Sequence, residues 1–287
     1  MSTVFNLLIK VFYDGTLFHG SQRQPRLRTV EGEVIKAFRN IGLNFEKFVA
    51  SGRTDKGVHA LSQVFMLTVR DVGEEKVEEV IGKVREELPV DIIIWGYRIV
   101  NFEFNPRFNA ICRRYVYVRY ARGFNVHKAS EIAKRFIGKH DFKCFSSYLY
   151  SQVPEFISTE RTILGFNIFK TDDIVIFDIV ADSFLRQMVR RIVSFTELYV
   201  AGKKSIKDLN TAFKGICEVA DVKPAAPKNL ILFDVTYPFS FKVISESVRE
   251  MKEYWMKKST KHMLFKFLYE HVDFKYDKPV FKQFSLT

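Results

Sequence analysis

The sequence predicts an α+β protein built from two halves, each a mixed sheet covered on one face by helices. Stretches rich in β-branched and aromatic residues alternate with stretches whose apolar residues recur at helical spacing. A similar order of stretches returns after Phe104. The length of 287 residues allows two modest domains, because domains usually contain about 100–200 residues.

The first half is predicted to span residues 1–103 and to alternate strands with helices. Its first strand ends at Asp14 and Gly15, a pair typical of turns, and Thr29 is placed to cap a helix that begins at Val30. The predicted strands cover residues 7–13, 63–69 and 92–97, and the predicted helices cover residues 30–41 and 74–87.

The second half is predicted to span residues 104–238. Its predicted strands cover residues 114–120, 162–169, 174–180 and 230–237, and its predicted helices cover residues 129–137 and 184–200. Residues 239–287 are rich in lysine and read as a basic helical extension, with apolar residues at helical intervals. We expect this extension to dock in cis on the carboxy-terminal half in an auxiliary role, so that a chain ending at Pro238 still folds. The alternative is a place at the subunit interface.

Charge and cysteine content narrow the class of protein. The 45 Lys and Arg residues exceed the 33 Asp and Glu residues and leave a net charge of +12, which favours nucleic acid as the partner. Cys112, Cys144 and Cys217 have no CxxC spacing, which excludes a cysteine-dense disulfide scaffold and a standard thiolate zinc site and favours a reducing compartment. The apolar run at the start is too short to span a membrane and lacks a signal-peptide cleavage pattern, so we predict a cytoplasmic protein.

The stretch from residue 50 to residue 60 carries the clearest chemical signal. It places Asp55 between Arg53 and Lys56, and nearby positive charge favours the ionised carboxylate, which can act as a nucleophile or a base. The alternative is a structural turn in which Asp55 bonds backbone amides and Gly57 supplies a positive φ. Composition alone does not separate the two.

The segment Gly52-Arg-Thr-Asp-Lys-Gly-Val-His-Ala60 resembles the signature of the tRNA pseudouridine synthase A family. Further segments resemble that family in the same order: residues 13–32, 107–117, 138–142 and 184–193. Ser21 is a departure, since bacterial members usually carry tryptophan there. The resemblance covers about residues 5–238. It implies two largely antiparallel sheets, each covered by helices, with an active-site cleft between the halves.

Matched residue by residue, the resemblance implies that Asp55 is the catalytic carboxylate, paired with Arg190, and that Tyr115 stacks on the target uracil. Arg53 would contact the RNA and help to open the target site. The reaction moves uracil from N1 to C5 attachment, so the base must stay in the pocket after the glycosidic bond breaks. Three routes remain open: the carboxylate adds to C1′, adds to C6, or removes the 2′ proton of the ribose.

The resemblance and the basic patterning also nominate RNA-binding residues. They are Arg53, Lys56, His59, Gln22, Arg23, Gln24, Arg26, Arg28, Arg107, Arg113 and Arg114. A solvated surface is the alternative interpretation of residues 22–28. His59, His140 and Asp141 do not form a triad by their spacing, and structural hydrogen bonding is the preferred interpretation for all three.

The resemblance further implies a homodimer that acts on the anticodon stem-loop of tRNA, at tRNA positions 38–40, without contact to a membrane or DNA. No metal or organic cofactor is expected, since the isomerisation has no redox step and no phosphate chemistry. Two other functions stay open at this point. One is an RNA-binding protein that has lost turnover, and the other is a base hydrolase that would release free uracil.

Overall fold

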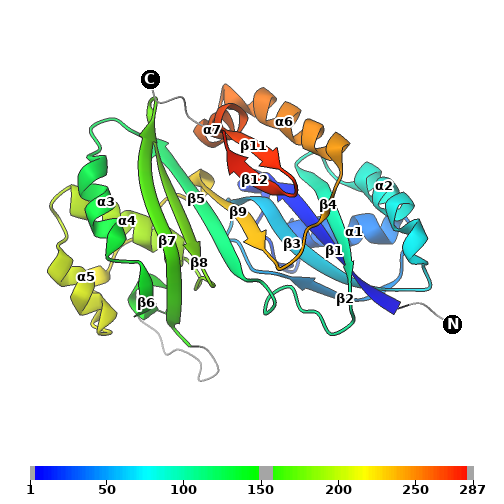
Figure 1. Cartoon of the computed structure of the whole chain (residues 1–287), viewed down its shortest axis with the longest axis horizontal. Helices are drawn as coiled ribbons and strands as arrows, with labels where there is room; N and C mark the ends of the chain where they lie inside the picture. Colours follow the sequence, from blue (N-terminus) through cyan, green and yellow to red (C-terminus); the bar gives the residue numbers. More distant parts are fainter. Residues whose placement is uncertain (1–3, 149–157, 283–287) are drawn as a thin grey trace. The chain divides into compact units, whose positions relative to one another are not determined.

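The computed structural model describes residues 4–148 and 158–282, which form two compact units. The first unit contains the residues up to Ile111 together with those from Leu232 onward, and the second unit contains Cys112–Ile231. Each unit combines helices with antiparallel pairs of strands (Figure 1), so the predicted α+β class is confirmed. The division differs from the predicted boundaries at residues 103 and 238, because the chain returns to the first unit at its end.

The first unit is built around strand β1 (Val4–Tyr13), which lies between β3 (His59–Arg70) and β4 (Ile92–Val100). Leu7 lies opposite Leu67 of β3, and both faces of β1 are buried. The remaining elements are β2 (Phe45–Ala50), β9 (Leu230–Thr236), β10 (Lys242–Val243), β11 (Val272–Lys275), β12 (Lys278–Phe281), α1 (Val30–Asn40), α2 (Val77–Glu87), α6 (Ser245–Ser259) and α7 (Met263–His271). The strands predicted at residues 7–13, 63–69 and 92–97 are confirmed, whereas β2 and the hairpin β11–β12 were not predicted.

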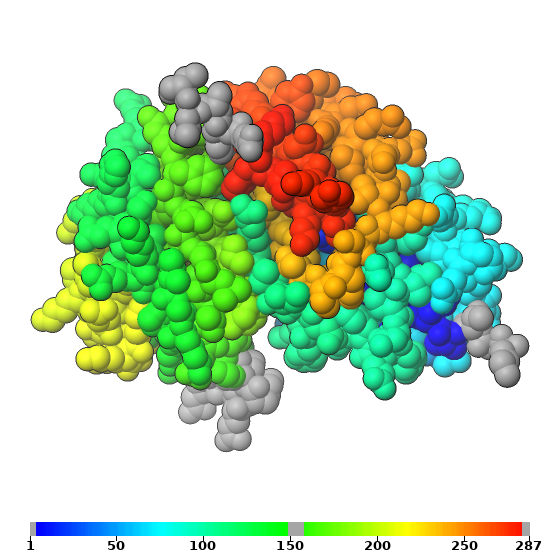
Figure 2. Space-filling view, viewed as in Figure 1, coloured from blue at the N-terminus to red at the C-terminus, as the bar shows by residue number. Residues whose placement is uncertain are grey.

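The segment from β10 to β12, here called the tail, covers one face of the first unit's sheet. Met251 and Trp255 of α6 are fully buried, and Trp255 meets Phe12 of β1 with ring centres 6.0 Å apart. Phe274 of β11 lies edge-on to Trp95 of β4. In Figure 2 the orange and red atoms of the tail lie over the first unit. The expectation that this segment docks on the carboxy-terminal half is therefore wrong, and the tail belongs to the core of the first unit.

A buried lysine connects β1 with the end of the chain. The Nζ atom of Lys10 lies 2.9 Å from a carboxylate oxygen of Asp234 in β9 and donates to the carbonyl of Asp277, in the turn between β11 and β12, at 3.1 Å. Lys10 is 1% exposed, and its ammonium lies 5.1 Å from the ring centre of Trp95. A charge removed from water in this way is tolerated because it is paired and hydrogen-bonded.

The second unit has a four-stranded antiparallel sheet in the order β5-β8-β7-β6. Figure 1 shows its α-helices together on one face of this sheet. The elements are β5 (Cys112–Tyr120), β6 (Gly138–Asp141), β7 (Glu160–Thr171), β8 (Ile174–Ala181), α3 (Val126–Lys134), α4 (Met188–Val200) and α5 (Ile206–Phe213). Helix α4 begins later than predicted, because Gln187 has a φ of 66° that is incompatible with a helix. Helix α5 was not predicted, although Ser205 and Asp208 form a capping box at its start.

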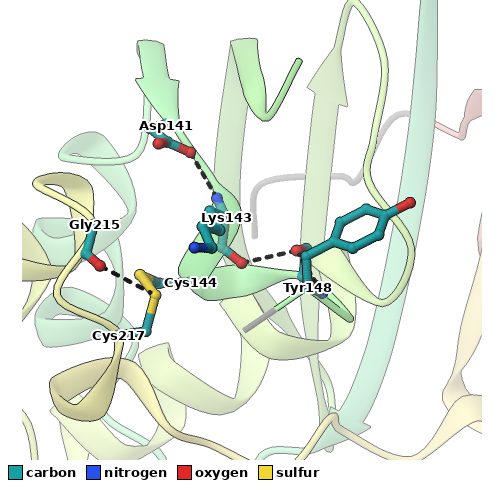
Figure 3. Close-up of a disulfide and its surroundings, with 7 residues drawn as sticks. Asp141, Lys143, Cys144, Tyr148, Gly215 and Cys217 are labelled. Carbon is teal, nitrogen blue, oxygen red and sulfur yellow. Dashed lines mark hydrogen bonds between the residues drawn. A yellow bond between two sulfur atoms is a disulfide. The ribbon is translucent and has the colours of Figure 1, made fainter. Parts of the chain in front are cut away.

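Phenylalanines fill the space between this sheet and its helices. The ring of Phe136 meets those of Phe145 and Phe195 edge-on, and all three are fully buried. His140 stacks on Phe213 with ring centres 4.1 Å apart. The Asp141 carboxylate accepts the amide hydrogen of Lys143 at 2.8 Å (Figure 3), so His140 and Asp141 have the structural roles considered for them.

A disulfide joins Cys144 to Cys217 in the second unit (Figure 3). Cys144 lies in a short 3-10 helix after β6, and Cys217 begins another, 73 residues later. The sequence did not predict this pairing, since widely spaced cysteines do not identify their partners. Cys112 is not bonded to another cysteine.

Replacing both Cys144 and Cys217 by alanine is expected to lower the free energy of unfolding of the second unit by about 2–4 kcal/mol, because the bond restricts the unfolded chain. Urea titrations of the oxidised protein, the reduced protein and the double variant measure this loss. Reductant should not change the double variant further, and a Cys112→Ala protein should match the wild type. Equal midpoints for oxidised and reduced protein would contradict the expectation.

Candidate active site

The loop that carries Asp55 joins the end of β2 to the start of β3. Its backbone turns at Asp55, where the amide of Val58 donates to the carbonyl oxygen of Asp55 at 3.1 Å. Gly57 has a φ of 79°, the left-handed conformation that glycine adopts without strain. The positive φ considered for Gly57 is confirmed. Asp55 itself is half-buried, and the cations on either side of it, Arg53 and Lys56, are exposed.

Thr54 fixes the loop on the amino-terminal side of Asp55. Its amide donates to the hydroxyl of Ser21 at 2.9 Å, and its carbonyl accepts the amide hydrogen of Ser21 at 3.2 Å. Its own hydroxyl is hydrogen-bonded to that of Tyr13 at 2.8 Å. Burial raises the pKa of Tyr13 to about 12, so this hydroxyl stays protonated at neutral pH. Ser21 thus holds the residue next to Asp55 from a position where bacterial members usually carry tryptophan.

Gln63 of β3 holds the start of the loop, at residues that precede Thr54. Its side-chain oxygen accepts hydrogen bonds from the hydroxyl of Ser51 and the amide of Val64, and its side-chain nitrogen donates to the carbonyl of Gly52. Because these groups are buried, each would cost free energy if it lost its partner. The start of the loop is therefore fixed to the sheet.

Two glycines allow the segment after β1 to lie directly against the loop. A Cβ atom at Gly15 would come within 2.1 Å of the carbonyl oxygen of Val58. Gly20 has a φ of +99°, and a Cβ atom there would lie 3.0 Å from the carbonyl oxygen of Thr54. A side chain at either position would force the two segments apart.

His59 closes the carboxy-terminal side of the loop. It is 2% exposed, and its Nδ1 atom lies 3.1 Å from the amide nitrogen of Gly15 and 3.2 Å from the Asp14 carboxylate. Nδ1 accepts from Gly15 when unprotonated and donates to Asp14 when protonated. His59 is thus buried and bonded within the first unit, which favours the structural interpretation, and its contact with RNA stays a prediction.

Asp14 accepts hydrogen bonds from several segments at this point. Burial raises the pKa of its carboxyl, but hydrogen bonds from His59, Thr16 and Tyr254 outweigh burial and hold the pKa well below its usual range. Burial and the bond to Asp14 raise the pKa of Tyr254, so its hydroxyl is protonated and donates to the carboxylate at 2.7 Å. Asp14 is thus ionised in the folded protein.

The loop of residues 22–28 is only partly available for a partner. Arg28 makes a two-point ion pair with Asp91, with both N–O distances 2.9 Å, and a further bond to Glu33. Arg23 pairs with Glu31 but remains 55% exposed, and Arg26 is exposed with a φ of 60°. Gln22 and Gln24 are exposed. Arg28 therefore serves the first unit itself, and Arg26 is better placed to meet phosphate.

The two candidates on the second unit are half-buried. Tyr115 lies on β5 opposite Ile179, and its ring meets that of Phe184 edge-on with centres 5.2 Å apart. Arg190 lies in the first turn of α4, where its Nε atom donates to the carbonyl of Ala225 at 2.6 Å. The predicted pairing of Arg190 with Asp55 stays a prediction.

The remaining arginine candidates differ in accessibility. Arg113 is 9% exposed and donates to the carbonyl of Asp182, and Arg114 makes a two-point ion pair with Asp178. Both side chains are therefore hydrogen-bonded within the second unit. Arg107 of the first unit is exposed and stays in the RNA-binding set.

Among residues 4–148 and 158–282, no three His, Cys, Asp or Glu side chains are grouped so as to hold a metal ion. Over the same residues, no helix is both long and apolar enough to cross a membrane.

Sequence reasoning missed the residues that hold the Asp55 loop: Tyr13, Asp14, Ser21 and Gln63. Asp14 carried a signal, since it follows a strand of apolar residues and precedes a glycine, but that pattern is typical of any turn. No sequence pattern indicated the role of Gln63, because a glutamine within a strand is recognised as a support for the loop only when its hydrogen-bond partners are known.

Comparison with known proteins shows where the chain belongs. A family model described as tRNA pseudouridine synthase matches residues 132–238. The tRNA pseudouridine synthase A of Pyrococcus abyssi is 38% identical over 255 residues, which cover 87% of this chain and 93% of the relative. That of Pyrococcus furiosus is 34% identical over 267 residues, covering 91% of this chain and 95% of the relative.

Among solved structures, the archaeal box H/ACA sRNP Nop10-Cbf5 complex matches 67% of this chain and 42% of that chain, with 14% identity and a TM-score of 0.33. Structural similarity at this level is too low to support a conclusion about function. The sequence matches, on a fold of two α+β units, define an isomerase that acts on uridine in tRNA. The chain belongs to the tRNA pseudouridine synthase A family, and the resemblance read from the motifs is confirmed.

Proposed function

We propose that this enzyme isomerises uridines in the anticodon stem-loop of tRNA and that Asp55 supplies the catalytic carboxylate. The observation that carries the proposal is the loop between β2 and β3. Buried partners fix its backbone on both sides of Asp55, whereas Arg53 and Lys56 remain exposed. A reacting group needs such a fixed position, because small displacements cost catalysis.

The chemistry requires an anionic group at the sugar or the base. The N1–C1′ bond breaks, the uracil turns, a C5–C1′ bond forms, and the hydrogen on C5 leaves to solvent while N1 gains a proton. A carboxylate promotes this sequence by adding to C1′ or C6, or by removing the 2′ proton. All three routes use the side chain of Asp55.

Residues of the second unit would hold the base and balance the charge. In this proposal Tyr115 stacks on the uracil, and Arg190 pairs with Asp55. A uridine in a helical stem must first leave the stack, at a cost of a few kcal/mol, and exposed Arg53 occupies the space that it leaves. The phosphates bind to exposed side chains, namely Arg23, Arg26, Lys56 and Arg107, with Gln22 and Gln24.

We further propose that two copies of the chain act together on one tRNA in the cytoplasm. The support is the resemblance to a family whose members act as dimers. The net charge of +12 supports the RNA partner.

Tritium release tests the function. The purified protein is mixed with tRNA that carries tritium at uracil C5, and the modified positions are then mapped on unlabelled tRNA. We expect tritium in the solvent and pseudouridine in the anticodon stem-loop. Tight tRNA binding without tritium release would favour a silent RNA-binding protein, and free uracil would favour a hydrolase. Either result would overturn the proposal.

Removal of the Tyr115 ring is expected to cost much more activity than removal of its hydroxyl. Stacking of a base on an aromatic ring contributes about 1–3 kcal/mol, so Tyr115→Ala should lose most of kcat/KM while Tyr115→Phe retains much of it. Single-turnover tritium release measures both. Equal losses for the two variants would transfer the role to the phenol oxygen.

Binding to tRNA is expected to weaken steeply with salt, since each phosphate contact contributes about 0.7–0.9 to the slope of log K against log salt. Replacing Arg26 and Lys56 together by glutamine should flatten this slope by about 1.5. Filter-binding titrations measure it. Lys83→Gln and Lys170→Gln, combined in one protein, remove the same charge from residues outside the proposed set and should leave the slope unchanged. An unchanged slope in the first variant would show that this pair does not meet phosphate.

A further inference from the structure

Asp14 joins three separate segments of the first unit. Its side chain is 3% exposed and lies at the end of β1. The carboxylate accepts the amide hydrogen of Thr16 at 3.0 Å and the hydroxyl hydrogen of Tyr254 in α6 at 2.7 Å. It also lies 3.2 Å from Nδ1 of His59 at the start of β3. A single buried charge therefore connects the tail with the strand that follows the Asp55 loop.

A short series of contacts leads from this carboxylate to the turn at Asp55. The amide nitrogen of Gly15, next to Asp14, lies 3.1 Å from Nδ1 of His59. Gly15 lies so close to Val58 that no side chain fits between them. The amide of Val58 in turn donates to the carbonyl of Asp55. These contacts place Asp14 two short steps from the carboxy-terminal side of the loop.

We propose that Asp14 is a positioning residue for the isomerase reaction, and that its bond to Tyr254 makes helix α6 part of the support for the Asp55 loop. The inference rests on the proposed role of Asp55. Asp14 acts through the backbone of the loop and takes no part in the chemistry.

The support on this side is separate from that on the other. Ser21 and Gln63 hold the amino-terminal side of the loop without help from Asp14. A cavity of about 210 Å³ lies beside the bond, lined in part by Asp14, Asp91 and Tyr254. Water in this cavity can satisfy the carboxylate when the tyrosine hydroxyl is removed. Loss of the bond is thus expected to loosen one side of the loop while the unit stays folded.

Kinetics of two variants and their combination test the proposal. Tyr254→Phe removes the hydroxyl but keeps the ring that packs against Phe12 and Phe265. We expect kcat to fall about three- to tenfold with KM for tRNA within about twofold, because loop displacement affects the reacting geometry more than binding. The kcat of Asp14→Asn should fall at least as far. In the double variant the two losses of kcat should be less than additive in free energy, because both changes weaken the bond between Asp14 and Tyr254.

Hydrogen exchange gives a measurement that does not depend on activity. In Tyr254→Phe, amides of residues 52–60 should exchange about threefold faster or more, while those of β4 keep their wild-type rates. Tyr269→Phe is the matched control, because it removes a hydroxyl from an exposed tyrosine of α7 in the same tail. It should match the wild type in both kinetics and exchange.

The outcomes separate this inference from the proposed function. Wild-type kcat and exchange in both folded variants would overturn the positioning role, and so would faster exchange across the whole first unit, which would mark general destabilisation. A wild-type protein without Asp55-dependent turnover would overturn the proposed function instead, whereas the exchange result would still stand. If Asp14→Asn does not fold, Tyr254→Phe decides alone.

Discussion

A chain that ends at Pro238 is expected to lose the fold of its first unit, and with it all activity. The truncation removes seven apolar side chains that are at most 2% exposed: Met251, Trp255, Leu264, Phe265, Phe267, Leu268 and Val272. Burial of each contributes about 1.5–3 kcal/mol, and together they match or exceed the net stability of about 5–15 kcal/mol typical of a protein. The truncation also uncovers Phe12 and Trp95 and leaves Lys10 without the carbonyl of Asp277.

Tryptophan fluorescence measures this loss directly. The chain has two tryptophans, and only Trp95 remains after truncation, where it loses its contact with Phe274. Its emission should match that of the urea-unfolded protein and should show no cooperative change on titration. The full-length protein, titrated in parallel, should show the emission of buried tryptophan and a cooperative transition. A blue-shifted emission with a full-length midpoint in the chain ending at Pro238 would contradict the expectation.

Asp55→Asn is expected to reduce kcat roughly a thousandfold or more, because loss of a reacting group removes most of the acceleration that depends on it. The amide has the same size as the carboxylate but is neither a nucleophile nor a base. Affinity for tRNA should stay within a few fold, since exposed cations supply the binding.

The two quantities are measured in parallel, by tritium release and by filter binding. Asp221→Asn is the matched control, because it makes the same change in charge at an exposed aspartate of the second unit. It should retain wild-type turnover. Normal turnover in Asp55→Asn would remove Asp55 from the chemistry, and a comparable loss in Asp221→Asn would assign the effect to net charge.

The strands with clear apolar runs could be predicted from the sequence, as could the class of fold. The strand at residues 92–97 and the strand at residues 174–180 lie where their patterns placed them, because β-branched runs bounded by turn residues leave few alternatives. The place of the tail could not be predicted. Its helical spacing showed that α6 has an apolar face, but a periodic pattern does not tell which sheet that face covers.

Some residues of the candidate site could likewise be predicted from the sequence, and others could not. Motif resemblance nominated Asp55, Tyr115 and Arg190, since their residue types recur in a recognisable order, and their roles stay predictions. The bonds of Ser21, Asp14 and Gln63 depend on segments that meet only in the folded chain. Basic patterning also named Arg28 and Arg114, which make ion pairs within the protein. The sequence alone does not distinguish an arginine that pairs with a carboxylate of the protein from one that binds phosphate.

The contact between Lys10 and Asp277 sets an order of events during protein synthesis. These two residues are 267 positions apart in the chain, so the first unit cannot be completed until Asp277 has been synthesised. The second unit is continuous from residue 112 to residue 231 and has all its partners well before then. Domains fold as units while the chain emerges. The second unit can therefore complete its fold before the first unit does. Until the tail is made, one apolar face of the amino-terminal sheet stays uncovered, and such a face is a surface that a chaperone can bind.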